Sequence, residues 1–190
     1  MSLVGAMILV PAVLAGCSGD GDDSSDGKGG SGNAGDHAEQ SVATDARIGA
    51  VRGTIDDATS TQVVAAVSAV VDRWIDGAYG GDYPRKDFAP AFVDFTKDAR
   101  ALALKQPTVM SNAALGPNLE GVEITTRVVL VDVLAPRGKV AASTARFRLV
   151  MTTRGEKETE EVLTGRLMLT PDAKGWHVFG FKVDRGQVGA

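Results

Sequence analysis

The stretches VEITTRVVLVDVL at residues 122–134 and VAASTARFRLVMTT at residues 140–153 alternate apolar and polar side chains over most of their length. The same period of two continues in ETEEVLTGRLMLT at residues 158–170 and in WHVFGFKVDR at residues 176–185. Because successive side chains of a strand point to opposite faces, this alternation is typical of strands that bury one face of a sheet. The four stretches therefore predict four β-strands.

Short segments with turn-forming residues separate these stretches, at residues 136–138, 154–157 and 171–175. Connections this short join neighbouring antiparallel strands, so we predict a four-stranded antiparallel meander. Gly165 and Gly180 fall inside the predicted strands, where glycine often marks a bulge or a bend. A long and curved sheet is the expected result.

Two apolar stripes of helical period precede the strands. In TQVVAAVSAVVDRWIDGAY, at residues 61–79, large apolar side chains recur every three or four residues, and capping candidates lie at residues 57–60. A second repeat of this kind runs from Phe88 to Leu102. The sequence thus predicts an α+β fold in which two or three N-terminal helices pack on a curved four-stranded antiparallel sheet.

The N-terminal residues have the pattern of an export signal. The apolar run LVGAMILVPAVL at residues 3–14 has the length of a signal-peptide core and is short for a membrane span. Leu14-Ala15-Gly16-Cys17 follows it directly and resembles the lipobox of bacterial lipoproteins, in which the cysteine thiol receives lipid. This resemblance implies cleavage before Cys17 and anchoring of the lipidated Cys17 to the outer face of the cell membrane.

The segment after Cys17 is rich in Gly, Ser and Asp and nearly devoid of apolar side chains, which predicts disorder. We accordingly expect four regions: a signal peptide at residues 1–16, a lipidated cysteine and disordered tether at 17–57, a cone-shaped domain at 58–186 and a tail at 187–190.

Composition limits the chemistry of the chain. Its 190 residues are 44% hydrophobic, which suffices for one core. Residues 1–50 hold seven of the 24 acids and two of the 20 bases, so residues 51–190 carry 17 acids and 18 bases. This near-neutral balance lacks the basic stripe that nucleic-acid binding requires, so we expect no nucleic-acid partner. With one cysteine and only His37 and His177 as imidazoles, we expect no metal site and no cofactor.

The predicted order of elements resembles the cone-shaped fold of the nuclear transport factor 2-like and SnoaL-like proteins, one of the cystatin-like folds. The resemblance covers residues 60–185 and is carried best by the ending, where the turn Lys174-Gly175 precedes Trp176-His177-Val178. The chain is similar to actinobacterial lipoproteins of this fold and, more distantly, to Mce-associated proteins. The superfamily includes ketosteroid isomerases as well as scaffolds, so the resemblance leaves both an enzyme and a binding protein open.

Asp132 is the acid that the resemblance to ketosteroid isomerases singles out, because a strand aspartate is the general base in those enzymes. Alternation places it on one face with Ile124, Val128, Leu130 and Leu134. A carboxyl buried on such a face would have a raised pKa and could act as a general base. The alternative is that Asp132 lies near the strand end and pairs with an arginine or with water.

Tyr79 and His177 are the other catalytic candidates, Tyr79 as an oxyanion donor and His177 as a strand histidine. More often, such a tyrosine caps a core and such a histidine packs at an edge. Large rings are candidates to line a ligand pocket: Trp74, Phe92, Phe147 and Trp176. Five arginines are candidates for a basic patch on the outer sheet face, which a solvated charged surface would also explain: Arg127, Arg146, Arg148, Arg154 and Arg166.

From these patterns we expect a membrane-anchored extracytoplasmic lipoprotein with a non-enzymatic binding or assembly role, whose partner is a small apolar ligand or an envelope protein. The alternative is a ketosteroid-isomerase-like or SnoaL-like enzyme with Asp132 as its general base. A third hypothesis is a homodimer that forms through the open sheet face.

Overall fold

The four alternating stretches form strands in the computed structural model, which describes residues 42–189. They are β2 (Leu119–Ala135), β3 (Ala142–Gly155), β4 (Thr159–Asp172) and β5 (Gly175–Gln187). Each pairs antiparallel with the next along the chain. Residues 42–189 belong to one compact unit, and these strands supply most of its sheet.

A fifth strand corrects the predicted fold class. β1 (Asp45–Gly53) pairs parallel with β2, so the sheet is mixed and has the order β1-β2-β3-β4-β5. The prediction of a four-stranded antiparallel sheet, and with it the cone-shaped fold expected from the resemblance, is therefore wrong, although the chain remains α+β. The sequence pattern places residues 45–53 in the tether because DARIGAVRG lacks apolar alternation. This edge strand is largely exposed, and its backbone pairing with β2 leaves no such pattern in the sequence.

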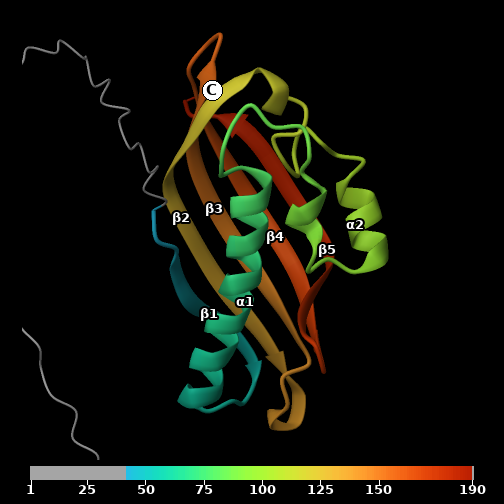
Figure 1. Ribbon diagram of the computed structural model, residues 1–190. Helices are drawn as coiled ribbons and strands as arrows, with labels where there is room; N and C mark the ends of the chain where they lie inside the picture. Colours follow the sequence, from blue (N-terminus) through green and yellow to red (C-terminus); the bar gives the residue numbers. More distant parts are fainter. Residues whose placement is uncertain (1–41, 190) are drawn as a thin grey trace, which may run out of the picture. The chain divides into compact units, whose positions relative to one another are not determined.

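The first predicted helix is present as α1 (Asp57–Ala78). Its N-cap is Asp56, whose carboxylate accepts a hydrogen bond from the Thr59 amide at 2.6 Å. The predicted apolar stripe is buried along the helix: Val63, Val67, Val70, Val71, Trp74, Ile75 and Ala78. The helix lies across one face of the sheet and contacts β1, β2, β3 and β5 (Figure 1). We call the opposite face of the sheet the outer face.

The second predicted helix is divided into two short pieces. A 3-10 turn, η1 (Ala89–Phe92), and the two-turn helix α2 (Lys97–Ala103) replace one helix over 88–102. Between them the backbone pairs with the edge of β5, because Thr96 N donates to Val178 O and Val178 N donates to Asp94 O, both at 2.9 Å. Residues 94–96 therefore cannot be helical. Within residues 42–189 there are two α-helices, and the third that we considered is not among them.

A bulge in β2 decides which side chains face the helix. The register with β3 shifts between Ile124 and Thr126, so the alternation changes phase at that point. Ile124 is buried in the core, whereas Val128 and Leu130 lie on the outer face. Arg127, expected on the outer face, is instead only 5% exposed and its Nη2 lies 2.5 Å from Asp76 Oδ1 of α1.

Candidate functional site

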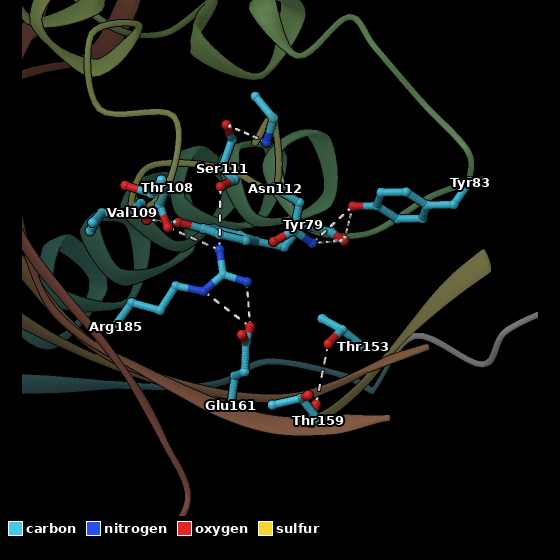
Figure 2. Close-up of polar contacts among 11 residues, drawn as sticks. Tyr79, Tyr83, Thr108, Val109, Ser111, Asn112, Thr153, Thr159, Glu161 and Arg185 are labelled. Atoms are coloured by element: carbon cyan, nitrogen blue, oxygen red, sulfur yellow. Dashed lines mark hydrogen bonds and ion pairs between the residues drawn. The ribbon is translucent and has the colours of Figure 1, made fainter. Parts of the chain in front are cut away.

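Around the catalytic candidate Tyr79, polar side chains and backbone groups form a hydrogen-bonded cluster (Figure 2). The Tyr79 hydroxyl donates a hydrogen bond to Val109 O at 2.5 Å. Trp74 Nε1 donates to the next carbonyl, that of Met110, at 3.2 Å. Both side chains come from the C-terminal half of α1 and the residue that ends it, and both are at most 1% exposed. They satisfy two backbone acceptors that would otherwise be buried without a partner.

Arg185 of β5 pairs with the carbonyls on either side of these two. Its Nη1 donates to Thr108 O at 3.1 Å and to Ser111 O at 3.4 Å. Its Nε donates to Glu161 of β4 at 3.0 Å, and the two side chains of this ion pair are only 10% and 13% exposed. Four consecutive carbonyls, at 108–111, thus receive side-chain donors. We call residues 108–111 the carbonyl loop.

Asn112 fixes the end of the carbonyl loop to the end of α1. Its backbone amide donates to Ala78 O at 2.9 Å, and its Nδ2 donates to the Tyr83 hydroxyl at 3.0 Å. The Tyr83 hydroxyl in turn donates to Tyr79 O at 2.7 Å. Asn112 is fully buried, and its Oδ1 has no hydrogen-bond partner among the described residues. The loop is therefore held to the helix by buried side chains.

The Tyr79 hydroxyl already has a structural role, because it donates a hydrogen bond to the carbonyl loop. Burial raises the pKa of its phenol far above the usual value, so the hydroxyl stays protonated and remains a hydrogen-bond donor. Its proton is already directed at Val109 O. As an oxyanion donor it would have to release this backbone acceptor, which would then be buried without a partner.

The four rings expected to line a pocket mostly fill the core. Trp74 and Phe92 are 1% exposed and Phe147 is 5% exposed. The Trp74 and Phe147 rings meet edge to face with centroids 5.2 Å apart, and Phe92 stacks against Phe95 in the same manner. Trp176 packs against the rim of this core and is half-buried. Three of the four rings are therefore core residues, and Trp74 and Phe147 contact each other directly.

Asp132 lies on the outer face, because the bulge in β2 reverses the expected alternation. Its carboxylate accepts hydrogen bonds from Arg146 Nε at 2.8 Å and Nη2 at 3.1 Å. It also accepts one from the Ala50 amide of β1 at 2.8 Å. A side chain at Gly49 would place its Cβ 2.2 Å from Asp132 Oδ1, so glycine is needed at this point. Asp132 therefore bridges the irregular edge strand and β3.

The bond to Arg146, assisted by the Ala50 amide, lowers the pKa of Asp132. This is the opposite of the raised pKa that the enzyme hypothesis requires, since a general base at neutral pH needs a pKa near that pH. The geometry agrees with the alternative that we considered, in which Asp132 pairs with an arginine. Both carboxylate oxygens already accept protein hydrogen bonds.

His177 lies at the start of β5, beside the turn from β4. Its Nε2 is 3.1 Å from Asp172 Oδ1, and the backbone amide of Lys174 donates to the same carboxylate oxygen at 2.6 Å. No hydrogen bond or ion pair among residues 42–189 joins two of the three catalytic candidates Asp132, Tyr79 and His177. They therefore do not form a catalytic group.

The outer face carries a row of cations that crosses the sheet. Arg146, Arg166 and Lys182 stand directly opposite one another on β3, β4 and β5. Leu130 of β2 lies opposite Arg146, and Arg47 of β1 lies opposite Leu130. We call Arg47, Arg146, Arg166 and Lys182 the basic row. Like charges at directly opposed positions of a sheet repel, so this arrangement disfavours the isolated fold.

Some of these charges are neutralised and others are not. Arg47 lies 2.8 Å from Asp45, Arg146 pairs with Asp132, and Lys182 lies 3.6 Å from Asp184. Arg166 and its diagonal neighbour Arg148 form no ion pair or hydrogen bond within the described part of the chain. They are therefore available to an anion.

A shallow hollow lies over the middle of the basic row. Its volume is about 350 Å³, within the range of ligand sites. It is lined by residues of three adjacent strands: Arg146, Phe147, Thr164, Gly165, Arg166, Lys182 and Asp184. The hydroxyl of Thr164 and the cations around it are groups that bind phosphate or carboxylate oxygens. The hollow therefore places cationic and hydroxyl groups together on the outer face.

The sequence alone could not show which basic residues lie together on the outer face. The alternating arginines of β3 and β4 indicated a basic face, but Arg47 was missed because β1 was not predicted as a strand, and Lys182 was missed because the pairing register of β5 was unknown. Arg127 was included wrongly, since the bulge turns it inward. Counting back from the turn would pair Arg166 with Phe181, and the register shift between Met168 and Leu169 brings Lys182 opposite Arg166 instead.

Several other expectations concern residues outside this surface. No group of three or more His, Cys, Asp or Glu side chains within residues 42–189 is placed to hold a metal ion. No helix in the same range is long and apolar enough to cross a membrane. The signal peptide at 1–16, Cys17 and His37 lie outside the described residues.

Comparison with known proteins identifies no family for this chain. Neither a scan against protein families, nor a search of curated proteins, nor a search of solved structures finds a match to this chain.

We predict that Asp132→Asn lowers the free energy of unfolding by about 1 kcal/mol at pH 7, because the carboxylate accepts from Arg146 and Ala50. The folded-state pKa of Asp132 is lowered, so this contribution is present above the unfolded pKa of about 3.9 and is lost as pH falls through the lower folded value. Urea unfolding of both proteins between pH 3 and 7 measures the difference.

Asp82→Asn is the matched control, because Asp82 is exposed and has no partner in the described residues. This control should leave stability unchanged at every pH. A difference between wild type and Asp132→Asn that is equally large at acid and neutral pH would show that the ion pair is not its cause.

Proposed function

We propose that the protein is a membrane-anchored extracytoplasmic lipoprotein whose folded domain binds a negatively charged component of the cell envelope through its outer face. The observation that carries the binding role is the basic row, in which Arg166 stands between two further cations without a partner of its own among the described residues. A surface of this kind gains stability when an anion neutralises it.

The hydrogen bonding and packing of the interior favour a binding role over catalysis. The carbonyl loop engages Trp74, Tyr79 and Arg185, and the core rings pack against one another. Asp132, the candidate base, is held ionised by Arg146. No observation on residues 42–189 favours the enzyme as a second candidate function, and the same packing disfavours a small apolar ligand in the interior.

The membrane anchor rests on the sequence at residues 14–17, Leu-Ala-Gly-Cys, which follows the apolar run at 3–14. Two or more acyl chains hold a protein at a bilayer firmly, whereas one chain binds only marginally. Lipidated Cys17 would keep the domain within reach of the envelope surface and raise the local concentration of an envelope partner. The anchor and the basic row therefore serve the same role.

The anchor is tested by labelling cells with a palmitate analogue and separating membranes from soluble proteins. We expect the wild-type chain to carry the label and to sediment with membranes, and Cys17→Ser to carry no label. Ser18→Ala, a substitution at the next residue, should behave as wild type. Label on the Cys17→Ser protein would refute anchoring at this residue.

The binding role is tested with the unlipidated chain 18–190, which contains all of the described residues 42–189. We expect it to sediment with isolated envelopes at low salt, and Arg166→Glu to lose this binding. The carboxylate introduced by Arg166→Glu would lie between Arg146 and Lys182, so the variant should be at least as stable as wild type. The thermal midpoint of each protein is the control for folding.

Lys97→Glu on α2 makes the same change of charge away from the outer face, and it should bind as wild type does. If Arg166→Glu and Lys97→Glu bound equally well, or if wild type did not bind at all, the outer face would not be the binding surface.

A further inference from the structure

The side chains of the outer face indicate the kind of partner it fits. Two neighbouring rows of five side chains cross all five strands: Arg47, Leu130, Arg146, Arg166 and Lys182 in one, and Asp45, Val128, Arg148, Thr164 and Asp184 in the other. The first row contains four cations and no acid. Neither row contains an aromatic side chain. Protein-binding hot spots are rich in Trp, Tyr and Arg, and of these three residue types the two rows supply only arginine.

The dimensions of the basic row exceed those of one small anion. Neighbouring strands lie about 4.8 Å apart, so the four strand spacings from Arg47 to Lys182 cover about 19 Å. One phosphate group occupies only a small part of that length, so it would contact only one or two of the four cations. A surface that presents many separate anionic groups matches the row better. The hollow at Thr164 and Arg166 allows one such group to enter between the strands' side chains.

The charges of the row are of the kind that bind phosphate. Arginine offers a planar fork of donors that fits phosphate oxygens, and Lys182 adds a point charge. The exposed fractions of the Arg146 and Lys182 side chains are 50% and 67%, so both can reach beyond the sheet surface. Arg148 and Arg166 need not break an ion pair within the described residues to bind.

We infer that the basic row binds the phosphate headgroups of anionic phospholipids, so that the domain lies with its outer face against the membrane. This inference rests on the proposed function, because lipidated Cys17 would hold the domain close to those headgroups. Basic residues near an anionic membrane add binding energy to a lipid anchor, and the two signals together give stable attachment. The partner of the outer face is then the bilayer itself.

The test is sedimentation of the unlipidated chain 18–190 with vesicles of two compositions. One is phosphatidylcholine alone, and in the other phosphatidylglycerol replaces about a third of it. We expect binding to the anionic vesicles only, and weaker binding as salt is raised. The double variant Arg148→Gln/Arg166→Gln should bind roughly 25-fold more weakly, about fivefold for each cation lost.

Lys97→Gln/Lys105→Gln is the matched control, since it removes two exposed cations from α2 and the residues after it. This control should retain wild-type binding. Equal loss of binding in the two double variants, or equal binding of wild type to both vesicles, would overturn the inference.

Two further outcomes separate this inference from the proposed function. If chain 18–190 bound native envelopes through Arg166 but not anionic vesicles, the proposed function would stand and the partner would be a protein or another polymer. If it ignored vesicles but gained thermal stability in inorganic pyrophosphate, lost again in Arg148→Gln/Arg166→Gln, the site would belong to a soluble phosphate ligand. Either result would overturn binding to phospholipid.

Discussion

The hydrogen bonds to the carbonyl loop are the constraint on which the rest of the structure depends. The carbonyls of residues 108–111 all accept hydrogen bonds from side chains, and the loop passes from exposed at Thr108 to buried at Met110 and Ser111. Trp74 and Tyr79 donate from the end of α1 and Arg185 donates from β5, so the same bonds join the helix, the loop and the last strand. Arg185 in addition holds Glu161 of β4.

The hydrogen bonds to the carbonyl loop have a consequence for function. The polar side chains that could have formed an active site, above all Tyr79 and Arg185, are committed to backbone acceptors of the carbonyl loop. The aromatic rings beside them pack edge to face. What remains accessible is the outer face of the sheet, where Arg148 and Arg166 have no partner in the described residues. The candidate site is therefore outside the fold's core, on the surface that α1 does not cover.

The sequence predicts the helices and strands that have strong apolar periodicity. It does not predict the segments whose structure depends on hydrogen bonds to distant parts of the chain. The four alternating strands and the stripe of α1 follow from side-chain pattern alone. β1 was missed because an exposed edge strand is defined by its backbone bonds to β2, which leave no apolar alternation. The second helix was overestimated because the backbone at 94–96 pairs with Val178 instead. Local pattern cannot show such long-range bonds.

The candidate site shows the same limit at single residues. A one-residue bulge near Thr125 reverses the faces along the rest of β2. It moves Asp132 from the expected apolar side to the outer face and turns Arg127 toward Asp76. Arg146 and Arg166 were recognisable as outward residues, but their direct opposition with Lys182 depends on register. Lipidation of Cys17 stays a prediction from sequence.

Side-chain donors to the carbonyl loop close the interior of the domain, and Arg185→Met tests this most directly. The variant leaves Glu161 buried without its partner and removes the donor of Thr108 and Ser111. Measured by urea unfolding at neutral pH, it should lose roughly 3–5 kcal/mol of stability. A loss of under about 1 kcal/mol, the value of an exposed ion pair, would contradict the claim.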